Sequence, residues 1–503
     1  MKIEIMDTTL RDGEQTQGIS FSPSEKLHLV KFLLTELRVN RVEIASARVS
    51  KGEFEAAEKI AKWATDNGFL DKIEVLGFID GEKSLQWIQD SGLKVINLLS
   101  KGSLRHLEKQ LRKSPEQHAE DIKQVVALAQ SRGISVNLYL EDWSNGMIYS
   151  PEYVYFMLES LQHENIQRFM LPDTLGILNQ DQTYGFCKQI VDRYPQLHFD
   201  FHAHNDYDLS VANVYAAVKA GVKGVHTTIN GLGERAGNAP LSSVVGVLHD
   251  QLKIKTTIKE TSIHKASQLA ERFSGIRVPV NKPIVGENVF TQTSGIHADG
   301  DNKDNLYFNN LLPERFGRKR KYALGKLSGK ASIVKNLEEL GFRLDEPSLK
   351  QVTDRIIELG DKKETITIDD LPYIIADVLN TGDNNYHIFI KNYSFSLSHG
   401  MRPSANLQLQ IKDKLHEGMS IGDGQYDAFM KALWKIYDSI GKEKPELTDY
   451  AVTIPPGGKT DALVETIISW NFKGKSFITK GLDVDQTVAA IKATEKMLNI
   501  IEL

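Results

Sequence analysis

The stretch His198-Phe-Asp-Phe-His-Ala-His-Asn-Asp206 decides the fold class of this 503-residue chain. Side chains alternate between the two faces of a β-strand, so even-numbered and odd-numbered residues lie on opposite faces. Up to His204, one face carries three histidines and an aspartate, and the other carries two phenylalanines and an alanine. In a closed barrel, one strand face points towards the axis and the other packs on helices. We therefore expect the polar face to point into a barrel.

This strand is the seventh of eight that alternate with helical segments over about 250 residues, which predicts a TIM barrel, an α/β fold. The predicted strands are 2–6, 40–45, 73–78, 93–99, 134–140, 168–172, 197–203 and 224–229. The predicted helices include 23–37, 54–66, 116–131, 151–162, 180–193, 209–220 and 241–252. A TIM barrel carries its chemistry at the carboxyl ends of its strands. Polar residues gather there, at 7–14, Glu43, Asn97, Lys101, 141–142, 173–174, 202–206 and 230–238.

The rest of the chain divides into two further parts. We predict a catalytic barrel over 1–268, a mainly helical linker region over 269–380 and a separate α+β domain over 386–503. In the last part, β-rich segments at 387–397, 404–412, 449–454 and 462–472 flank helices at 425–440 and 485–500.

Composition excludes several classes of protein. The net charge of −5 argues against a broad nucleic-acid surface, and no segment is apolar over the roughly 18 residues of a membrane span. The amino terminus enters a strand pattern without a signal peptide, so we expect the cytoplasm. The single cysteine, Cys187, excludes an intrachain disulfide and lies in an amphipathic segment, which favours a core thiol over a nucleophile.

His202 and His204, two residues apart at the end of the seventh strand, are placed to bind one metal ion. Asp12, after the first strand, is the candidate third ligand, and this mixed set is compatible with Zn, Mn, Co or Mg. Alternatively, the histidines lie on the surface and Arg11 and Asp12 form a surface ion pair of little energetic value. Glu141 either pairs with a cation or acts as an acid or base.

Three motifs resemble those of the acetyl-CoA-condensing 2-oxo-acid aldolases, the family of isopropylmalate, citramalate and homocitrate synthases. They are Asp7-Thr-Thr-Leu-Arg-Asp-Gly-Glu-Gln15, His202-Ala-His-Asn-Asp206 and Gly231-Leu-Gly-Glu-Arg-Ala-Gly-Asn238. Taken alone, the glycines of the third motif resemble a phosphate-binding loop only weakly. The resemblance extends through Gly295-Ile-His297 and Leu324-Gly-Lys-Leu-Ser-Gly329. It reaches Pro455-Pro-Gly-Gly-Lys-Thr-Asp461 and Asp485-Gln-Thr-Val-Ala-Ala490, which resemble the family's amino-acid-sensing domain.

The resemblance implies a role for each matching residue. The implied metal ligands are Asp12, His202, His204 and, more weakly, Asn238. Arg11 would stabilise charge on the substrate oxygen, Glu141 would assist proton transfer, and Thr174 would contact the substrate carboxylate. His297 and Tyr307 would reach the active site of a partner subunit, which implies a homodimer.

The implied reaction condenses acetyl-CoA with a small 2-oxo acid. The metal polarises the keto carbonyl as a Lewis acid. A base removes a proton from the acetyl methyl group, and the enolate attacks the carbonyl carbon while Arg11 faces the developing charge. Hydrolysis of the thioester then drives the reaction forward.

The choice of 2-oxo acid depends on three residues near strand ends. Leu76, Leu99 and Tyr139 would form a small apolar pocket that fits the methyl group of pyruvate. Isopropylmalate synthases usually have serine at position 139 and histidine at position 97, whereas 41–52 and 139–146 are most similar to citramalate synthases. We therefore predict pyruvate, with 2-oxoisovalerate as the alternative. The three side chains could instead be core, and a few methyl groups discriminate by only about 1–3 kcal/mol.

The regulatory domain is predicted to bind a branched-chain amino acid, isoleucine if the product is citramalate. The candidate contacts are Tyr426, Asp427, Tyr450 and Ile454. Two alternative functions are less favoured. The first is a non-catalytic amino-acid sensor, which is disfavoured because every implied catalytic residue is present. The second is the reverse reaction, catalysed by the related 3-hydroxy-3-methylglutaryl-CoA lyases, which is disfavoured because those enzymes are shorter and lack the regulatory tail.

Overall fold

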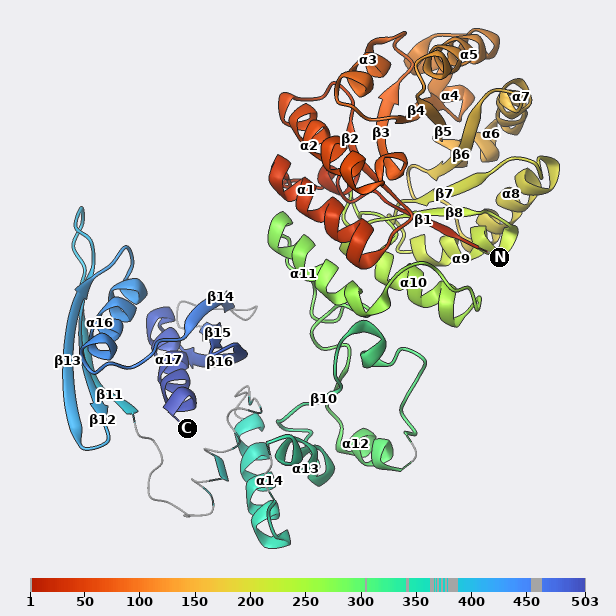
Figure 1. Ribbon diagram of the computed structural model, residues 1–503. Coiled ribbons are helices and arrows are strands. Elements are labelled where there is room, and N and C mark those ends of the chain that lie inside the picture. Colours follow the sequence, from red (N-terminus) through yellow and green to blue (C-terminus); the bar gives the residue numbers. More distant parts are fainter. Residues whose placement is uncertain are drawn as a thin grey trace. The chain divides into compact units, whose positions relative to one another are not determined.

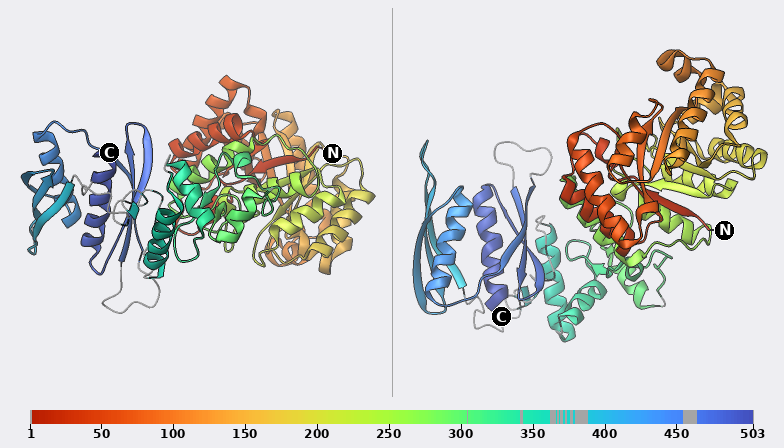
Figure 2. Two further views of the ribbon diagram at one scale, coloured as in Figure 1. Left: turned by 90° about the horizontal axis from the view of Figure 1, so that it is seen from below. Right: turned by 45° about the horizontal axis from the view of Figure 1, so that its top comes forward.

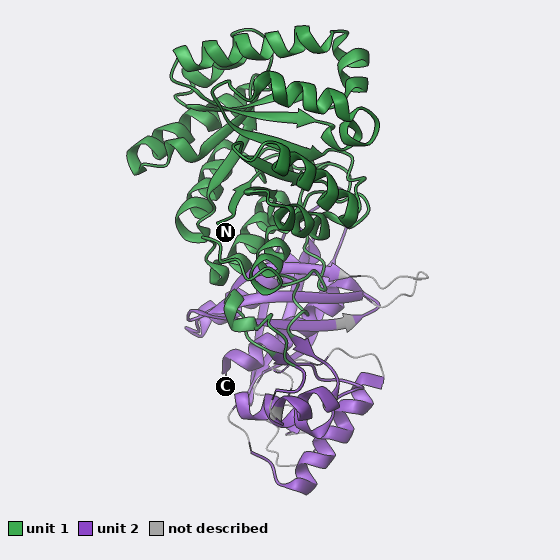
Figure 3. Ribbon diagram, turned by 90° about the vertical axis from the view of Figure 1, so that its right-hand side faces the viewer, with its two compact units in different colours: residues 1–290, 308–320 green, residues 291–307, 321–503 purple. Residues whose placement is uncertain are grey.

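The computed structural model describes residues 2–303, 305–340, 343–361, 388–453 and 464–502, with Ile366, Ile368, Leu371, Ile374, Ile375 and Val378. The chain divides into two compact units, one of residues 1–290 with 308–320 and one of residues 291–307 with 321–503 (Figure 3). Within the described residues, no helix is both long enough and apolar enough to cross a membrane.

The first unit contains a closed barrel of eight parallel strands surrounded by helices (Figure 1). The strands are β1 (Glu4–Asp7), β2 (Arg41–Ser46), β3 (Ile73–Phe78), β4 (Val95–Lys101), β5 (Ser135–Glu141), β6 (Ile166–Asp173), β7 (Phe199–Ala203) and β8 (Gly224–Thr227). β1 pairs with β8 from Glu4 opposite Gly224, which closes the sheet. The predicted TIM barrel and its eight strands are confirmed.

Helices follow the strands as the sequence pattern requires. The predicted helices correspond to α1 (Pro23–Lys31), α2 (Lys51–Asn67), α5 (Pro115–Ser131), α7 (Pro151–Leu161), α8 (Gln180–Arg193), α9 (Ser210–Ala220) and α10 (Leu241–Asp250). α1 and α5 each begin with a capping box and a proline, at Ser22 and Ser114. The predicted 23–37 helix continues past Lys31 as a π-helical segment, Phe32–Leu37. Helices α3 (Lys83–Asp90) and α6 (Trp143–Tyr149) were not predicted.

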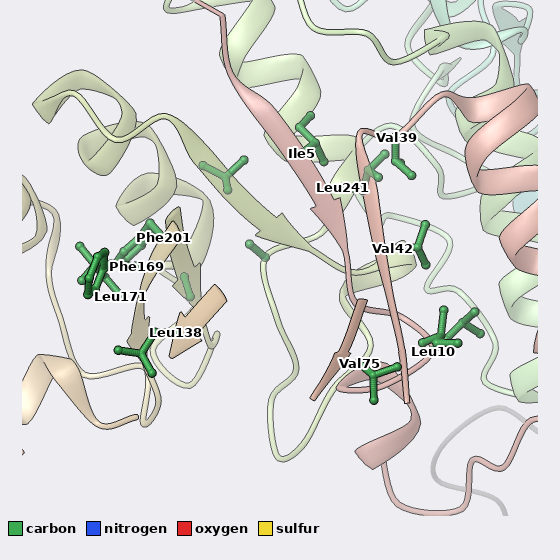
Figure 4. Packing of buried hydrophobic residues seen from close by; sticks show 14 of the residues in the cluster. Ile5, Leu10, Val39, Val42, Val75, Leu138, Phe169, Leu171, Phe201 and Leu241 are labelled. Carbon is green, nitrogen blue, oxygen red and sulfur yellow. The ribbon is translucent and has the colours of Figure 1, made fainter. Parts of the chain in front are cut away.

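The apolar strand faces pack outward, between the sheet and the helices. Leu138, Phe169, Leu171 and Phe201 lie together there (Figure 4). Cys187 is a buried residue of helix α8, as expected of a core thiol. The even-numbered side chains of β7 therefore point towards the barrel axis, where Asp200 and His202 are almost fully buried.

The second unit combines a mainly helical part with a part that contains two larger sheets. Its helices α12 (Gly295–Asn302), α13 (Lys330–Glu339) and α14 (Glu346–Asp361) precede two three-stranded antiparallel sheets. These sheets are β11 (Ile388–Ser396), β12 (Ser404–Ile411) and β13 (Lys414–Ile421), then β14 (Glu446–Thr453), β15 (Val464–Phe472) and β16 (Lys475–Asp483). Helix α16 (Gln425–Ser439) packs on the first sheet and α17 (Gln486–Glu502) on the second (Figure 2). The predicted α+β domain is confirmed.

Strands β13 and β16 escaped prediction because they carry few consecutive apolar residues. Each forms a hairpin with the preceding strand, β13 through Lys412-Asp413 and β16 through Lys473-Gly474. Both hairpin turns place a lysine at positive φ. Lys-Gly between two β-rich segments is a recognisable hairpin signal, so β16 was within reach of the sequence.

Candidate active site

Asp12, His202 and His204 come together at the carboxyl end of the barrel. Asp12 follows β1, and the two histidines end β7. The Oδ2 atom of Asp12 lies 3.4 Å from Nε2 of His202 and 3.8 Å from Nε2 of His204. All three residues are buried, and their possible ligand atoms lie within 4.8 Å of one another. The alternative of two surface histidines is therefore wrong.

The protonation of these groups suits a divalent cation. Burial lowers the pKa of His202. Burial and the neighbouring His202 lower the pKa of His204 to about 4. Both imidazoles are therefore neutral. Burial alone would raise the pKa of Asp12, but Arg11 and the histidines hold it well below the usual carboxyl range. Two neutral imidazoles and a carboxylate form a mixed nitrogen and oxygen ligand set, which is compatible with Zn, Mn, Co or Mg.

Asn238 stands beside these three groups after β8. Its Nδ2 donates to Oδ1 of Asp12 at 2.9 Å and to the carbonyl of Leu232 at 3.2 Å. Its Oδ1 is buried and accepts no hydrogen bond from the described residues. A buried acceptor without a donor is costly, so this oxygen fits a site that holds a cation.

The glycines after β8 have a backbone role. Gly231, Gly233 and Gly237 all have φ between +74° and +156°. A Cβ at Gly233 would lie 2.2 Å from Nδ2 of Asn238, and one at Gly237 would lie 1.9 Å from the carbonyl oxygen of Gly231. The loop therefore closes around Asn238 and holds it against Asp12, which accounts for the glycines without a phosphate.

Arg11 is fixed by two carboxylates. Its Nη1 contacts Oδ2 of Asp12 at 2.9 Å and its Nε contacts Oε2 of Glu43 at 2.6 Å. The side chains of Arg11 and Asp12 are 9% and 3% exposed, so the alternative of a surface ion pair is wrong. Buried Lys26 donates to the carbonyl of Leu10 at 3.0 Å and thereby anchors the same loop to α1.

Glu43 is a site residue whose role the sequence pattern did not reveal. It is completely buried on β2 and accepts from Thr8 Oγ1 at 2.7 Å and from Asn97 Nδ2 at 2.8 Å. Burial opposes its ionisation, but Arg11 and these donors lower the pKa of Glu43 below its ordinary value. The ionised carboxylate therefore holds Arg11 in place. Its position as a charged residue inside the second strand was the only signal.

Glu141, at the end of β5, forms an ion pair with Lys101 at the end of β4. Its side chain keeps 25% exposure, whereas that of Lys101 is 8% exposed. His118 Nε2 accepts a 3.2 Å hydrogen bond from the backbone nitrogen of Lys101, and Tyr153 donates to its carbonyl at 2.9 Å. These two hydrogen bonds fix the backbone of Lys101. Its ammonium is the cation with which Glu141 pairs, which was one of the two predicted roles of Glu141.

A cavity of about 190 Å³ opens over these groups. Its lining includes every barrel residue predicted to touch substrate or metal except Asn238: Arg11, Asp12, Leu76, Leu99, Tyr139, Glu141, Thr174, His202 and His204. It also includes Gln15, Pro172 and Glu234, which were not predicted. Thr174 Oγ1 accepts from the backbone nitrogen of Asp142 at 2.9 Å, so its hydroxyl proton remains available for the cavity.

The remaining predicted residues belong to the second unit. His297 is exposed on α12, and its ring lies 4.2 Å from that of Tyr307. A Cβ at Gly300 would meet the Tyr307 ring at 2.4 Å, so glycine permits this packing. In the sheet domain, the rings of Tyr426 and Tyr450 are 5.4 Å apart.

The other two predicted effector contacts are Asp427 and Ile454. Asp427, on α16, pairs with Lys431 at 2.6 Å and accepts from the backbone nitrogen of Asp423 at 2.8 Å. Ile454 and the 455–461 motif lie outside the described residues.

Comparison with known proteins assigns each part of the chain to a family. Residues 2–270 match the HMGL-like family, residues 284–364 the homocitrate synthase post-HMGL domain-like family, and residues 365–502 the LeuA allosteric (dimerisation) domain. The chain belongs to the HMGL-like family. The resemblance inferred from the three motifs is therefore confirmed.

Full-length relatives carry two different names. A Methanopyrus kandleri protein provisionally assigned as an (R)-citramalate synthase is 33% identical, over 92% of this chain and 89% of its own length. A second protein of that organism, provisionally assigned as a 2-isopropylmalate synthase, is 32% identical over 99% and 98%. The 2-isopropylmalate synthase of Methanocaldococcus jannaschii is 33% identical over 99% and 95%. Identity alone therefore does not separate the two activities.

Proposed function

We propose that this chain condenses acetyl-CoA with pyruvate to give (R)-citramalate and CoA, as an acyltransferase of branched-chain amino-acid biosynthesis. The observation that carries this proposal is the apolar side of the 190 Å³ cavity. Leu76, Leu99 and Tyr139 line it directly beside Arg11 and the metal-binding group. A 2-oxo acid bound with its oxygens on the polar side therefore directs its alkyl group at this wall.

The size of the wall favours a methyl group. Tyr139 is 3% exposed and Leu76 is 7% exposed, and Met6 and Met170 pack behind them. The isopropyl group of 2-oxoisovalerate would have to displace part of this packing. Each added methyl in an apolar pocket changes discrimination by about 1–3 kcal/mol. Pyruvate is accordingly the better substrate, with measurable turnover of its nearest homologues.

The metal site supports the family's chemistry. Asp12, His202 and His204 would hold a divalent cation, with Asn238 Oδ1 as the weaker fourth donor. A cation bound there supplies Lewis-acid polarisation of the keto oxygen. Arg11, held by Glu43, directs fixed positive charge at the same cavity and stabilises the oxyanion that develops there.

Glu141 is the candidate for proton transfer, because its carboxylate lines the cavity and is partly accessible beside Lys101. One C–H bond of the acetyl methyl group breaks, and the carbon forms a new bond to the keto carbon of pyruvate. Water then cleaves the thioester. Acetyl-CoA, pyruvate and water thus give citramalate, CoA and a proton.

The second candidate is a 2-isopropylmalate synthase, because relatives of that name are equally similar over the full length. A panel of 2-oxo acids with acetyl-CoA, followed by release of free CoA, separates the two. We expect kcat/KM for pyruvate to exceed that for 2-oxoisovalerate by at least about tenfold. A preference for 2-oxoisovalerate would overturn the proposal, and no CoA release with any 2-oxo acid would favour the non-catalytic sensor.

We further propose that the chain works as a homodimer whose sheet domain binds isoleucine. The match of residues 365–502 to an allosteric dimerisation domain supports both ideas. Tyr426 and Tyr450, with Asp427 nearby on α16, offer an apolar contact and an acidic group for an ammonium. His297 and Tyr307 would complete the partner's active site. Calorimetry with isoleucine and leucine tests the effector, and no heat with either amino acid contradicts it.

A further inference from the structure

A row of hydrogen-bonded side chains lies beneath the cavity along the barrel axis. The hydroxyl of Tyr139 is 3.1 Å from Nδ1 of His226 on β8. His226 Nε2 is 3.2 Å from Oδ2 of Asp200 on β7, and Arg41 forms an ion pair with the same Oδ2. His226 and Asp200 are 1% and 0% exposed. Tyr139 lines the apolar side of the cavity, and the proposed function gives no role to His226, Asp200 or Arg41.

The direction of each hydrogen bond follows from the groups at its two ends. At the top, Arg11 Nη2 lies 3.5 Å from the Tyr139 oxygen, and a guanidinium only donates. The Tyr139 oxygen therefore accepts from Arg11, and its own proton points to Nδ1 of His226. At the bottom, Arg41 also only donates, so Asp200 is a carboxylate that accepts from His226. The imidazole thus carries its proton on Nε2 and presents the Nδ1 lone pair to Tyr139.

This arrangement fixes which part of Tyr139 faces the substrate. With the hydroxyl held between Arg11 and His226, the phenol ring forms the wall of the cavity. The ring is also edge-on to His226, at 5.6 Å between centroids. Its other neighbours include the His202 ring, edge-on at 6.1 Å between centroids, and the side chains of Met6, Met170, Leu76 and Leu99. Methionine is flexible and adapts to new shapes, so the apolar contacts alone hold the ring loosely.

We propose that His226, held in one tautomer by Asp200, is the positioning residue that fixes Tyr139 and thereby sets the size of the 2-oxo acid side chain that the cavity accepts. The inference rests on the proposed function, because it concerns the same pocket. His226 acts through Tyr139 and does not line the cavity. Its loss should let the phenol ring move against the methionines and enlarge the apolar side of the pocket.

The test compares two variants that differ by one methylene. His226→Asn places an amide near the position of Nδ1 and can still accept from Tyr139, whereas His226→Gln places it near Nε2 and keeps only the bond to Asp200. The readout is the ratio of kcat/KM for pyruvate to kcat/KM for 2-oxobutanoate. We expect His226→Gln to lower this ratio about tenfold and His226→Asn to keep it within about threefold of the parent. KM for acetyl-CoA should stay unchanged in both.

Tyr139→Phe provides the second arm, because it removes the hydroxyl through which His226 acts. The ratio should fall by a similar factor, and adding His226→Gln to it should lower the ratio little further. The matched control is His198→Asn, which removes a histidine that contacts Oδ1 of Asp200 at 3.0 Å but, in the described part of the chain, forms no hydrogen bond with Tyr139 or His226. This control should keep the parent ratio.

The outcomes separate the inference from the proposed function. If His226→Gln lowers kcat equally for both acids and leaves their ratio intact, the residue is only structural and the inference is wrong. Full additivity with Tyr139→Phe would also overturn it. If the parent enzyme prefers 2-oxoisovalerate, the proposed function fails. Thermal melting of each variant identifies loss of folding.

Discussion

At the scale of single residues, the site depends on charges that are buried together. Arg11, Asp12 and Glu43 are each at most 9% exposed in their side chains, and the one positive charge of Arg11 is shared by the two carboxylates. Removing one member of such a group leaves an uncompensated charge in a region of low dielectric constant, which costs several kcal/mol. Arg11 and Asp12 also line the cavity, so in the proposed reaction stability and catalysis depend on the same contacts.

Replacing Glu43 by glutamine should misplace Arg11. The amide still accepts a hydrogen bond but no longer offers a full negative charge to the guanidinium. We expect kcat to fall by about 10²-fold, the effect of disturbing one oxyanion-stabilising group. Steady-state kinetics with pyruvate measure it. Metal content should stay at the parent level, and unchanged kcat would show that Asp12 alone positions Arg11.

Replacing His202 by alanine should remove a metal ligand while the barrel remains folded. The affinity for a divalent cation then falls, and turnover is lost with it. Atomic emission on the purified protein measures bound metal, and circular dichroism measures folding. His198→Asn, directly before β7 and four residues before His202, is the control that should keep its metal. Full metal content in His202→Ala would remove this histidine from the site.

At the scale of elements, the positions of site residues depend on how helices hold strand ends. Helix α5 carries His118, whose Nε2 accepts a hydrogen bond from the backbone nitrogen of Lys101 at the end of β4. Burial, together with the charges of Lys113 and Lys101, lowers the pKa of His118 to about 4. The ion pair of Lys101 with Glu141 is therefore supported by a neutral histidine on a neighbouring helix.

Acid should destabilise the barrel through this residue. The unfolded chain takes up the proton near pH 6.5 and the folded chain near pH 4. Stability is therefore complete above pH 6.5 and is lost as the pH falls towards 4, by up to about 3 kcal/mol. His118→Gln keeps an acceptor and does not titrate. Urea unfolding at pH 7 and pH 4.5 should show a smaller loss for the variant, and an equal loss would contradict the assignment.

At the scale of the whole molecule, catalytic and regulatory parts have separate cores. The buried cluster of the barrel ends at Phe316, and the cluster of the sheet domain begins at Ile388. A third, smaller cluster, which includes Ile333 and Val352, lies between them along the chain. Each part therefore excludes water from its own core without the other.

A chain ended after Asn385 should keep a folded barrel and lose its response to isoleucine. The truncation removes all of the sheet-domain cluster and none of the barrel cluster. We expect CoA release from pyruvate to continue, without inhibition by isoleucine at concentrations that inhibit the full chain. Retained inhibition would place the effector site in residues 1–385.

The sequence by itself determined the barrel, the order of its strands and the candidate metal-binding group, because these depend on local periodicity and on the rule that strand ends meet at one edge. It located β7 from alternation alone, and His202, His204 and Asp12 followed. Only the tertiary structure decided how charges pair across strands: Glu43 with Arg11, Lys101 with Glu141, and His226 with Tyr139. These partners are 32 to 87 residues apart along the chain. Their contact depends on the register of neighbouring strands and on the width of the barrel, which no local pattern encodes.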